Sequence, residues 1–315
     1  MTWRNTVVSR TILATLVLVA CGRPVSDSRT VSGSPATQAA AAVDATSSTP
    51  LGADSGVLLD VIDGTSQTGF TLWPIAILVR DSLIDPPQFA EENAADPFVR
   101  RFLARDTRYP VFVDGAATGE VRISGARWTG CSSYEAHTAP TTATVPRTSV
   151  LAGRLPPRAR VARRRALLPG ERATLDSLLL VVLQQHGISA TTPRTEQFTV
   201  GFAFTVGDSD ARVVALVGNS SFTLPPADSQ HAIGVSLIAE QAGTGWSIRW
   251  QEFEESRTSE YQASGSQPID VLDIDGDGVE EVVFATFGVE SRSYLILRRR
   301  PGTWVQWYRG GGDGC

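Results

Sequence analysis

Lysine is absent from this chain of 315 residues, and all 28 basic residues are arginine. The absence excludes chemistry that depends on a lysine amine, such as Schiff-base formation or phosphate binding by a P-loop lysine. Arginine is no substitute in these roles, because its guanidinium stays charged. Histidine is also scarce. Only His137, His186 and His231 occur, so a three-histidine zinc site would need all of them.

A strong excess of charge is missing as well. The net charge of −5 argues against a nucleic-acid-binding protein, whose domains are usually strongly basic. The local exception is residues 154–172, which contain seven arginines. This segment predicts either a patch for anions and phospholipid headgroups or a solvated surface segment. We favour the solvated surface, because arginine takes every basic role in this chain.

The amino terminus has the features of an export signal. Arg4 and Arg10 precede an apolar stretch at 11–20, which is too short to cross a bilayer as a lone helix. It ends in Leu-Val-Ala-Cys at 18–21, which resembles the lipobox of bacterial lipoprotein signal peptides. The resemblance implies that residues 1–20 are removed and that Cys21 carries a lipid. Gly22, in place of Asp, implies an address in the outer membrane; the alternative is an ordinary secretory signal with a chance cysteine.

Two other cysteines remain, Cys131 and Cys315. Because an exported protein meets an oxidising compartment, we expect one disulfide between them; the alternative is two free thiols. The bridge would attach a glycine-rich tail at 310–314, expected to be flexible, to the middle of the chain. Residues 21–55 are rich in Ser, Thr, Ala and Pro and predict a disordered tether.

The remaining chain predicts an α+β fold, mainly antiparallel β-sheet with one or two packed helices. Asp96 and Pro97 are typical of a helix start, and a second helix is expected at 169–187 with Gly187 as its C-cap. Leucine and valine at helical spacing give that second helix one apolar face. We expect a β-rich region at 56–135, a linker at 136–150 and an α+β region at 151–315. The expected strands are 56–62, 71–79, 109–113, 119–123, 197–206, 211–217, 232–240, 246–253, 280–286, 293–297 and 304–308.

One segment carries a ligand pattern. Residues 273–281 read Asp-Ile-Asp-Gly-Asp-Gly-Val-Glu-Glu, with acidic residues at alternate positions of a tight loop. Calcium takes six to eight oxygen ligands, and close carboxylates repel one another without a cation. The sequence therefore predicts a structural calcium site, which would hold a hairpin together. The alternative is a metal-free acidic turn.

The loop is not an EF-hand, because position 12 is Phe284 rather than a bidentate Glu, and the flanking residues favour strands. It resembles the calcium loop of FG-GAP and integrin-α-like β-repeats. The resemblance covers about 20 residues and implies a ligand set, but it transfers neither the propeller fold nor adhesion, because this chain has one copy. The implied ligands are the carboxylates of Asp273, Asp275, Asp277 and Glu281 and the carbonyl of Val279.

No catalytic motif accompanies this loop. The three histidines lack a nearby partner pattern, although a Ser/His/Asp triad assembled in space needs none. Tryptophans 246, 250, 304 and 307 predict sheet core rather than a sugar-binding platform. The chain therefore predicts a lipid-anchored, non-enzymatic envelope protein, binding an envelope protein or polysaccharide. The alternatives are an envelope hydrolase for glycans or esters and a structural component of an envelope assembly.

Overall fold

The computed structural model describes residues 55–89, 91–141, 150–155, 164–207, 213–224, 231–257, 265–288 and 291–314. The lipobox with Cys21, the tether up to residue 54 and Cys315 lie outside the described residues. No helix in the described part of the chain is long and apolar enough to cross a membrane.

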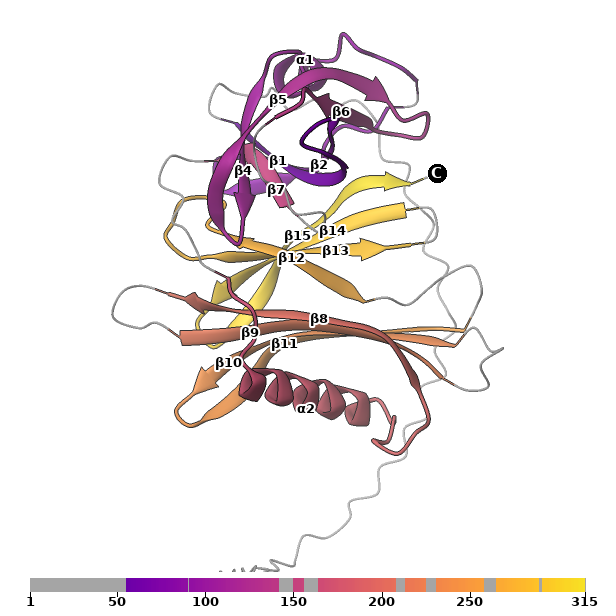
Figure 1. Ribbon diagram of the computed structural model, residues 1–315, viewed down its shortest axis with the longest axis vertical. Coiled ribbons are helices and arrows are strands. Elements are labelled where there is room, and N and C mark those ends of the chain that lie inside the picture. The colour runs from indigo at the N-terminus through magenta and orange to yellow at the C-terminus, as the bar shows by residue number, and fades with distance from the viewer. Residues whose placement is uncertain are drawn as a thin grey trace, which may run out of the picture. The chain divides into compact units, whose positions relative to one another are not determined.

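The first half of the described chain closes into a barrel (Figure 1). Strands pair in the order β1-β7-β4-β5-β6-β2, β1 pairs again with β2, and β3 extends β2. The closed ring leaves no free edge among its six strands. We call this sheet the barrel; its strands are β1 (Gly56–Thr65), β2 (Gly69–Val79), β3 (Ser82–Ile84), β4 (Arg108–Val113), β5 (Ala116–Trp128), β6 (Tyr134–Thr138) and β7 (Val150–Arg154).

Alternation along the barrel strands separates an inner core from an outer face. On β1, Val57, Leu59 and Val61 belong to the inner apolar cluster, whereas Leu58 belongs to a second cluster outside it. Helix α1 (Pro97–Phe102) adds Phe98 and other apolar residues to the inner core. It begins as the sequence predicts, since the Asp96 carboxylate accepts the backbone N–H of Phe98 at 2.7 Å.

The second half forms two further sheets of four strands each. The outer sheet, in the order β11-β10-β9-β8, consists of β8 (Thr195–Val206), β9 (Val213–Thr223), β10 (Ala232–Ala242) and β11 (Gly245–Ser256). The central sheet, in the order β12-β13-β14-β15, consists of β12 (Ser266–Leu272), β13 (Glu281–Phe287), β14 (Ser291–Arg300) and β15 (Thr303–Gly314).

Helix α2 (Pro169–Gln185) covers one face of the outer sheet. Its buried residues fall at the predicted helical spacing: Leu175, Leu179, Val182 and Leu183. Gly201 and Gly218 let it approach, because a Cβ at either position would press against the side chain of Leu175. The C-cap residue is His186, and the predicted terminating glycine, Gly187, directly follows it with a left-handed φ of 79°.

The central sheet is buried on both faces, which explains its near-continuous apolar strands. One face packs on the outside of the barrel through residues such as Val283 and Ile296. The opposite face packs on the outer sheet through residues such as Val282 and Leu295. Figure 1 shows the resulting order of layers: α2, outer sheet, central sheet and barrel.

The predicted fold class is confirmed: the chain is mainly antiparallel β-sheet with two helices described. Every predicted strand overlaps an observed one. Strands β3, β6 and β7 were not anticipated, and β12 was indicated only by the strand-favouring residues that flank the acidic loop. The structure differs from the prediction of a linker at 136–150 between two separate regions. Residues 136–138 belong to β6, and β7 pairs with both β1 and β4, so strands on either side of the expected linker share one barrel.

The glycine-rich segment at 310–314 was expected to be flexible, but in the structure it is part of a strand. Residues 310–314 belong to β15 and pair with β14. A Cβ at Gly311 would collide with the carbonyl of Ile75, and one at Gly312 with the carbonyl of Arg292. Both glycines have positive φ, so only glycine allows this close approach of three backbones.

Candidate cation-binding loop

The acidic loop joins β12 to β13, between strands as the sequence predicts. Asp273 and Glu281 are fully buried at its two ends, and Asp275 is half-buried between them. One carboxylate oxygen from each of these three residues lies within 4.8 Å of the others. Three of the four predicted acidic ligands are therefore brought together.

The backbone of the loop folds around these carboxylates. Glu281 Oε2 accepts the N–H of Ile274 at 2.8 Å, and Asp273 Oδ2 accepts the N–H of Gly278 at 3.1 Å. Gly276 and Gly278 take positive φ values of 77° and 89°, which the tight turn requires. The loop is thus shaped by its own carboxylates and glycines.

The fourth predicted acidic ligand, Asp277, is not part of this group. Asp277 is exposed, and its Oδ1 accepts the N–H of Val279 at 2.8 Å. The Val279 side chain packs against the core between the central and outer sheets. The role of its carbonyl stays a prediction.

Burial dominates the electrostatics of the site. The pKa of Glu281 is raised to about 9, mainly by burial; the carboxylates of Asp275 and Asp277 also act to raise it, while the Ile274 N–H and Arg298 act in the opposite direction. A buried carboxylate of this kind is stabilised in its charged form by a nearby cation.

Arg298 on β14 supplies one such cation, which the sequence analysis did not predict. Its backbone lies opposite Glu281 in the β13–β14 register. Its Nε lies 3.3 Å from Glu281 Oε1, its Nη2 pairs with Asp275 Oδ2, and its guanidinium lies 3.6 Å from the ring centroid of Trp307. Seventeen residues separate Glu281 from Arg298, and only the register of the hairpin shows that they meet.

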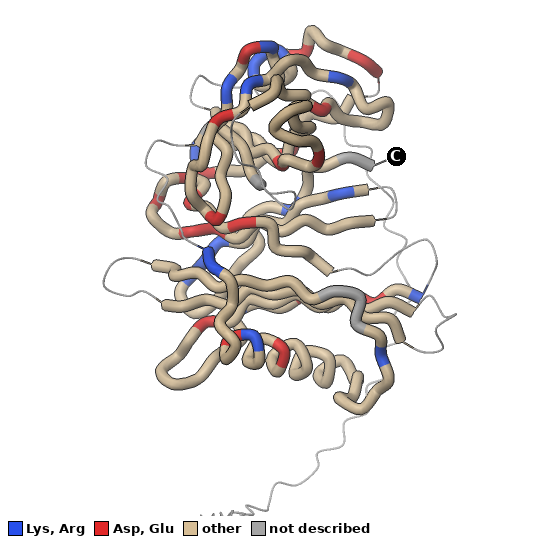
Figure 2. Tube along the Cα trace, in the orientation of Figure 1, with Lys and Arg blue, Asp and Glu red and all other residues tan. Residues whose placement is uncertain are grey.

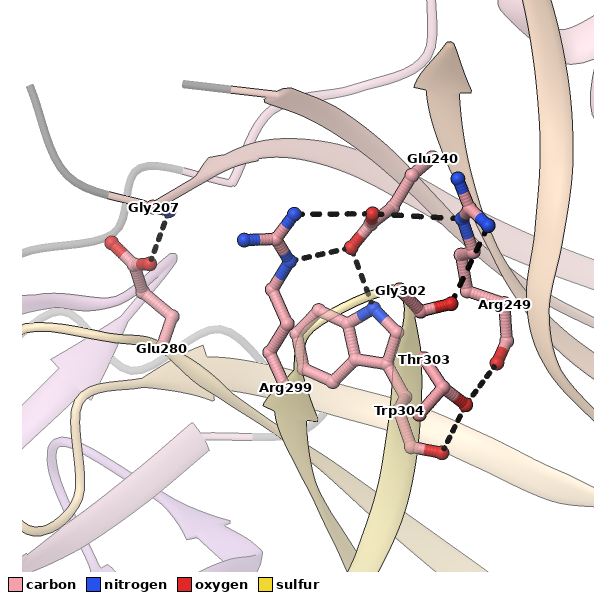
Figure 3. Close-up of polar contacts among 8 residues, drawn as sticks. All are labelled: Gly207, Glu240, Arg249, Glu280, Arg299, Gly302, Thr303 and Trp304. Carbon is pink, nitrogen blue, oxygen red and sulfur yellow. Dashed lines mark hydrogen bonds and ion pairs between the residues drawn. The ribbon is translucent and has the colours of Figure 1, made fainter. Parts of the chain in front are cut away.

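A second polar cluster lies on the opposite face of the central sheet (Figure 3). Arg299 follows Arg298 and, because strand side chains alternate, faces the outer sheet. Glu240 of β10 accepts hydrogen bonds from Arg299 Nε at 2.7 Å and from Trp304 Nε1 at 2.9 Å. Arg249 Nε lies 3.8 Å from the same carboxylate. Each carboxylate oxygen of Glu240 faces donors of the protein itself, so this cluster joins two sheets.

The acidic loop also touches the outer sheet. Glu280 Oε2 accepts the N–H of Gly207, which directly follows β8, at 3.4 Å (Figure 3). The loop therefore has contacts toward both faces of the central sheet.

The histidines do not form a shared site in the described residues. His137 Nε2 lies 3.2 Å from Glu135, and His231 Nε2 lies 2.6 Å from Glu255. His186 follows α2 and stacks on Phe253, with ring centroids 3.8 Å apart. No contact between any two of them is present in this part of the chain.

The four tryptophans named in the sequence analysis are distributed over three cores. Trp304 and Trp250 pack between the central and outer sheets, Trp246 packs with α2, and Trp307 packs on the barrel side. Because they face different layers, they do not form one aromatic platform, in agreement with the favoured interpretation.

Charges of both signs are interspersed along the described chain (Figure 2). In the arginine-rich segment, residues 156–163 lie outside the described residues. Arg165 pairs with both oxygens of Glu171 at 2.6 Å. Arg164 pairs with Asp114 and lies 3.7 Å from buried Asp270. Arg164 is thus a bridge between the barrel and the central sheet rather than a solvated side chain.

Comparison of the chain with protein-family models, with curated proteins and with solved structures found no match.

Proposed function

We propose that this protein is a lipid-anchored envelope protein whose β-rich body is stabilised by a divalent cation, calcium, bound in the loop between β12 and β13. The convergence of Asp273, Asp275 and Glu281 carboxylates carries the cation proposal. Oxygen ligands of this kind suit calcium, which tolerates irregular coordination. The ion would hold a loop that contacts both neighbouring layers.

The arrangement favours a structural role over hydrolysis. A hydrolytic site needs a nucleophile, a base and room for substrate. The described histidines each contact a different residue and do not converge on one another. The polar cluster around Glu240 uses its hydrogen bonds to join two sheets. A folded body of this kind, standing off a membrane on a tether, is suited to binding an envelope protein or a polysaccharide.

Thermal unfolding with and without calcium tests the cation site. Millimolar calcium should raise the melting temperature of the wild-type chain, because a ligand that binds only the folded state stabilises it. Asp275→Ala should abolish the rise, whereas Asp106→Ala, which removes an exposed carboxylate elsewhere, should retain it. A wild-type melting temperature that does not respond to calcium would refute the site.

Metabolic labelling with radioactive palmitate tests the anchor. The proposal rests on the lipobox at 18–21, and the wild-type chain should carry label that is extracted with lipid solvents. Cys21→Ala should carry none and should leave the membrane fraction. Retention of Cys21→Ala in the membrane would contradict a lipid anchor at this residue.

A further inference from the structure

Arg298 occupies an unusual position for a basic side chain, because it lies inside the acidic cluster. Its side chain is 9% exposed, as is that of Asp275, and Glu281 is fully buried. It reaches this place from β14, on the face of the central sheet that packs on the barrel. The cluster therefore contains its own positive charge.

Three groups hold the guanidinium there. Glu281 and Asp275 lie on two sides of it, and the indole of Trp307 lies against it at 3.6 Å from the ring centroid. Trp is the aromatic ring that attracts a cation most strongly. The arrangement offsets the repulsion between the carboxylates when no metal is bound.

The same arrangement is incompatible with a divalent ion. A guanidinium has only N–H donors, so it cannot be a metal ligand. Calcium needs the oxygens of Asp275 and Glu281, to which Arg298 now donates. Two cations that use the same oxygens at close range repel each other and exclude each other.

We propose that Arg298 is an intrinsic competitor of the cation: it holds Asp275 and Glu281 together in the metal-free loop, is displaced from them when a divalent ion binds, and so weakens the affinity of the site. The inference rests on the proposed cation site, and adds that the metal-free loop stays folded. The calcium concentration at which the site fills would then depend on how strongly the Arg298 guanidinium competes with calcium for these carboxylates.

Calorimetric titration of calcium into the full chain tests the competition. Arg298→Gln should bind calcium about tenfold or more tightly than wild type, because charged hydrogen bonds to Asp275 and Glu281 no longer have to be broken. Arg300→Gln is the matched control: it removes the same charge from an exposed position on β14 and should bind like wild type. Without calcium, Arg298→Gln should melt at a lower temperature than Arg300→Gln.

The outcomes separate the two proposals. Equal or weaker calcium binding by Arg298→Gln overturns the competition and leaves the cation site intact. Absence of binding in every variant, wild type included, refutes the site itself and the competition with it. If Arg298→Gln does not fold, the wild-type chain still decides: the NMR resonance of the Arg298 Nε–H should shift on saturation with calcium, and an unchanged resonance in the saturated protein overturns the displacement.

Discussion

Arg299 on β14 and Glu240 on β10 form a two-point contact between the central and outer sheets, in which the Glu240 side chain is 5% and the Arg299 side chain 24% exposed. Arg299 Nε and Nη2 donate to the two carboxylate oxygens of Glu240 at 2.7 and 3.2 Å. The neighbouring Arg298 points to the other face of the sheet, toward the acidic loop. Two consecutive arginines thus bind carboxylates in two different layers, as the alternation of a strand requires.

The first prediction concerns Glu240→Gln. Neutralising this buried carboxylate leaves the Arg299 guanidinium without its counter-charge, and breaking a buried pair costs about 3–5 kcal/mol. The free energy of unfolding, measured by urea denaturation, should fall by about this amount. Glu120→Gln is the control, because its pair with Arg108 has side chains that are 50% and 65% exposed. That change should cost less than about 1 kcal/mol. Similar losses for the two variants would contradict a stabilising role of the Arg299–Glu240 contact.

Asp270 on β12 makes the stability depend on pH. It is fully buried, and burial raises its pKa from 3.8 to about 6, against the influence of Arg164 and of the N–H groups of Val271 and Gly115. Since the folded-state pKa lies above the unfolded value, the folded chain binds this proton more tightly. Ionising Asp270 therefore destabilises the folded state by about 3 kcal/mol, and the loss develops as pH rises from 3.8 to above 6.

The second prediction follows for Asp270→Asn. The amide oxygen can still accept the N–H of Gly115 and no longer titrates. Asp270 ionises between about pH 4 and pH 7, and over this range the wild type should lose stability relative to the variant. Urea denaturation of both chains at several pH values measures this difference. Parallel curves for the two chains would show that Asp270 does not titrate in this range.

The third prediction concerns the disulfide between Cys131 and Cys315. Cys315 lies outside the described residues, but Ser133 and Gly312 line one small hollow, which brings the surroundings of Cys131 near the end of β15. The chain-entropy model gives about 5 kcal/mol for so long a loop, and reduction should lower the stability accordingly.

Non-reducing peptide mapping checks the bridge directly. Trypsin cuts this lysine-free chain only after arginine, and the digest should contain one peptide pair that joins residues 131 and 315 and separates on reduction. Cys131→Ser should remove the pair and match the stability of the reduced wild type. Recovery of both cysteines as alkylated thiols without reduction would disprove the bridge.

Local sequence rules predicted the elements that depend on a few neighbouring residues. Asp96 and Pro97 start α1, Gly187 ends α2, and the turn at Asp114 and Gly115 has the positive φ values of a two-residue hairpin. In each case the deciding interactions lie within a few residues of one another. The acidic spacing in 273–281 predicted the loop in the same way.

Pairings between distant residues were not predictable from one sequence. The Thr/Pro/Ala-rich stretch near 136–150 indicated a linker, yet β7 beyond it completes the barrel because β1 and β4 offer it backbone partners and an apolar surface. The glycines at 310–312 indicated a flexible tail, whereas their lack of side chains is what allows β15 to lie close to Ile75 and Arg292. Composition describes a segment but not the surface that it meets.

The sequence by itself determined the mainly antiparallel fold class, the start of α1, both ends of α2 and the acidic loop, because propensity, capping and turn chemistry act over short distances. Only the tertiary structure decided that the first strands close into a barrel, that Glu240 joins two sheets and that Arg298 lies among the loop carboxylates. These contacts depend on strand register and on the packing of layers, where residues far apart in the chain share one buried environment. The use of arginine in place of lysine has a physical consequence at the acidic loop. The planar guanidinium of Arg298 bridges two carboxylates and stacks on an indole at the same time.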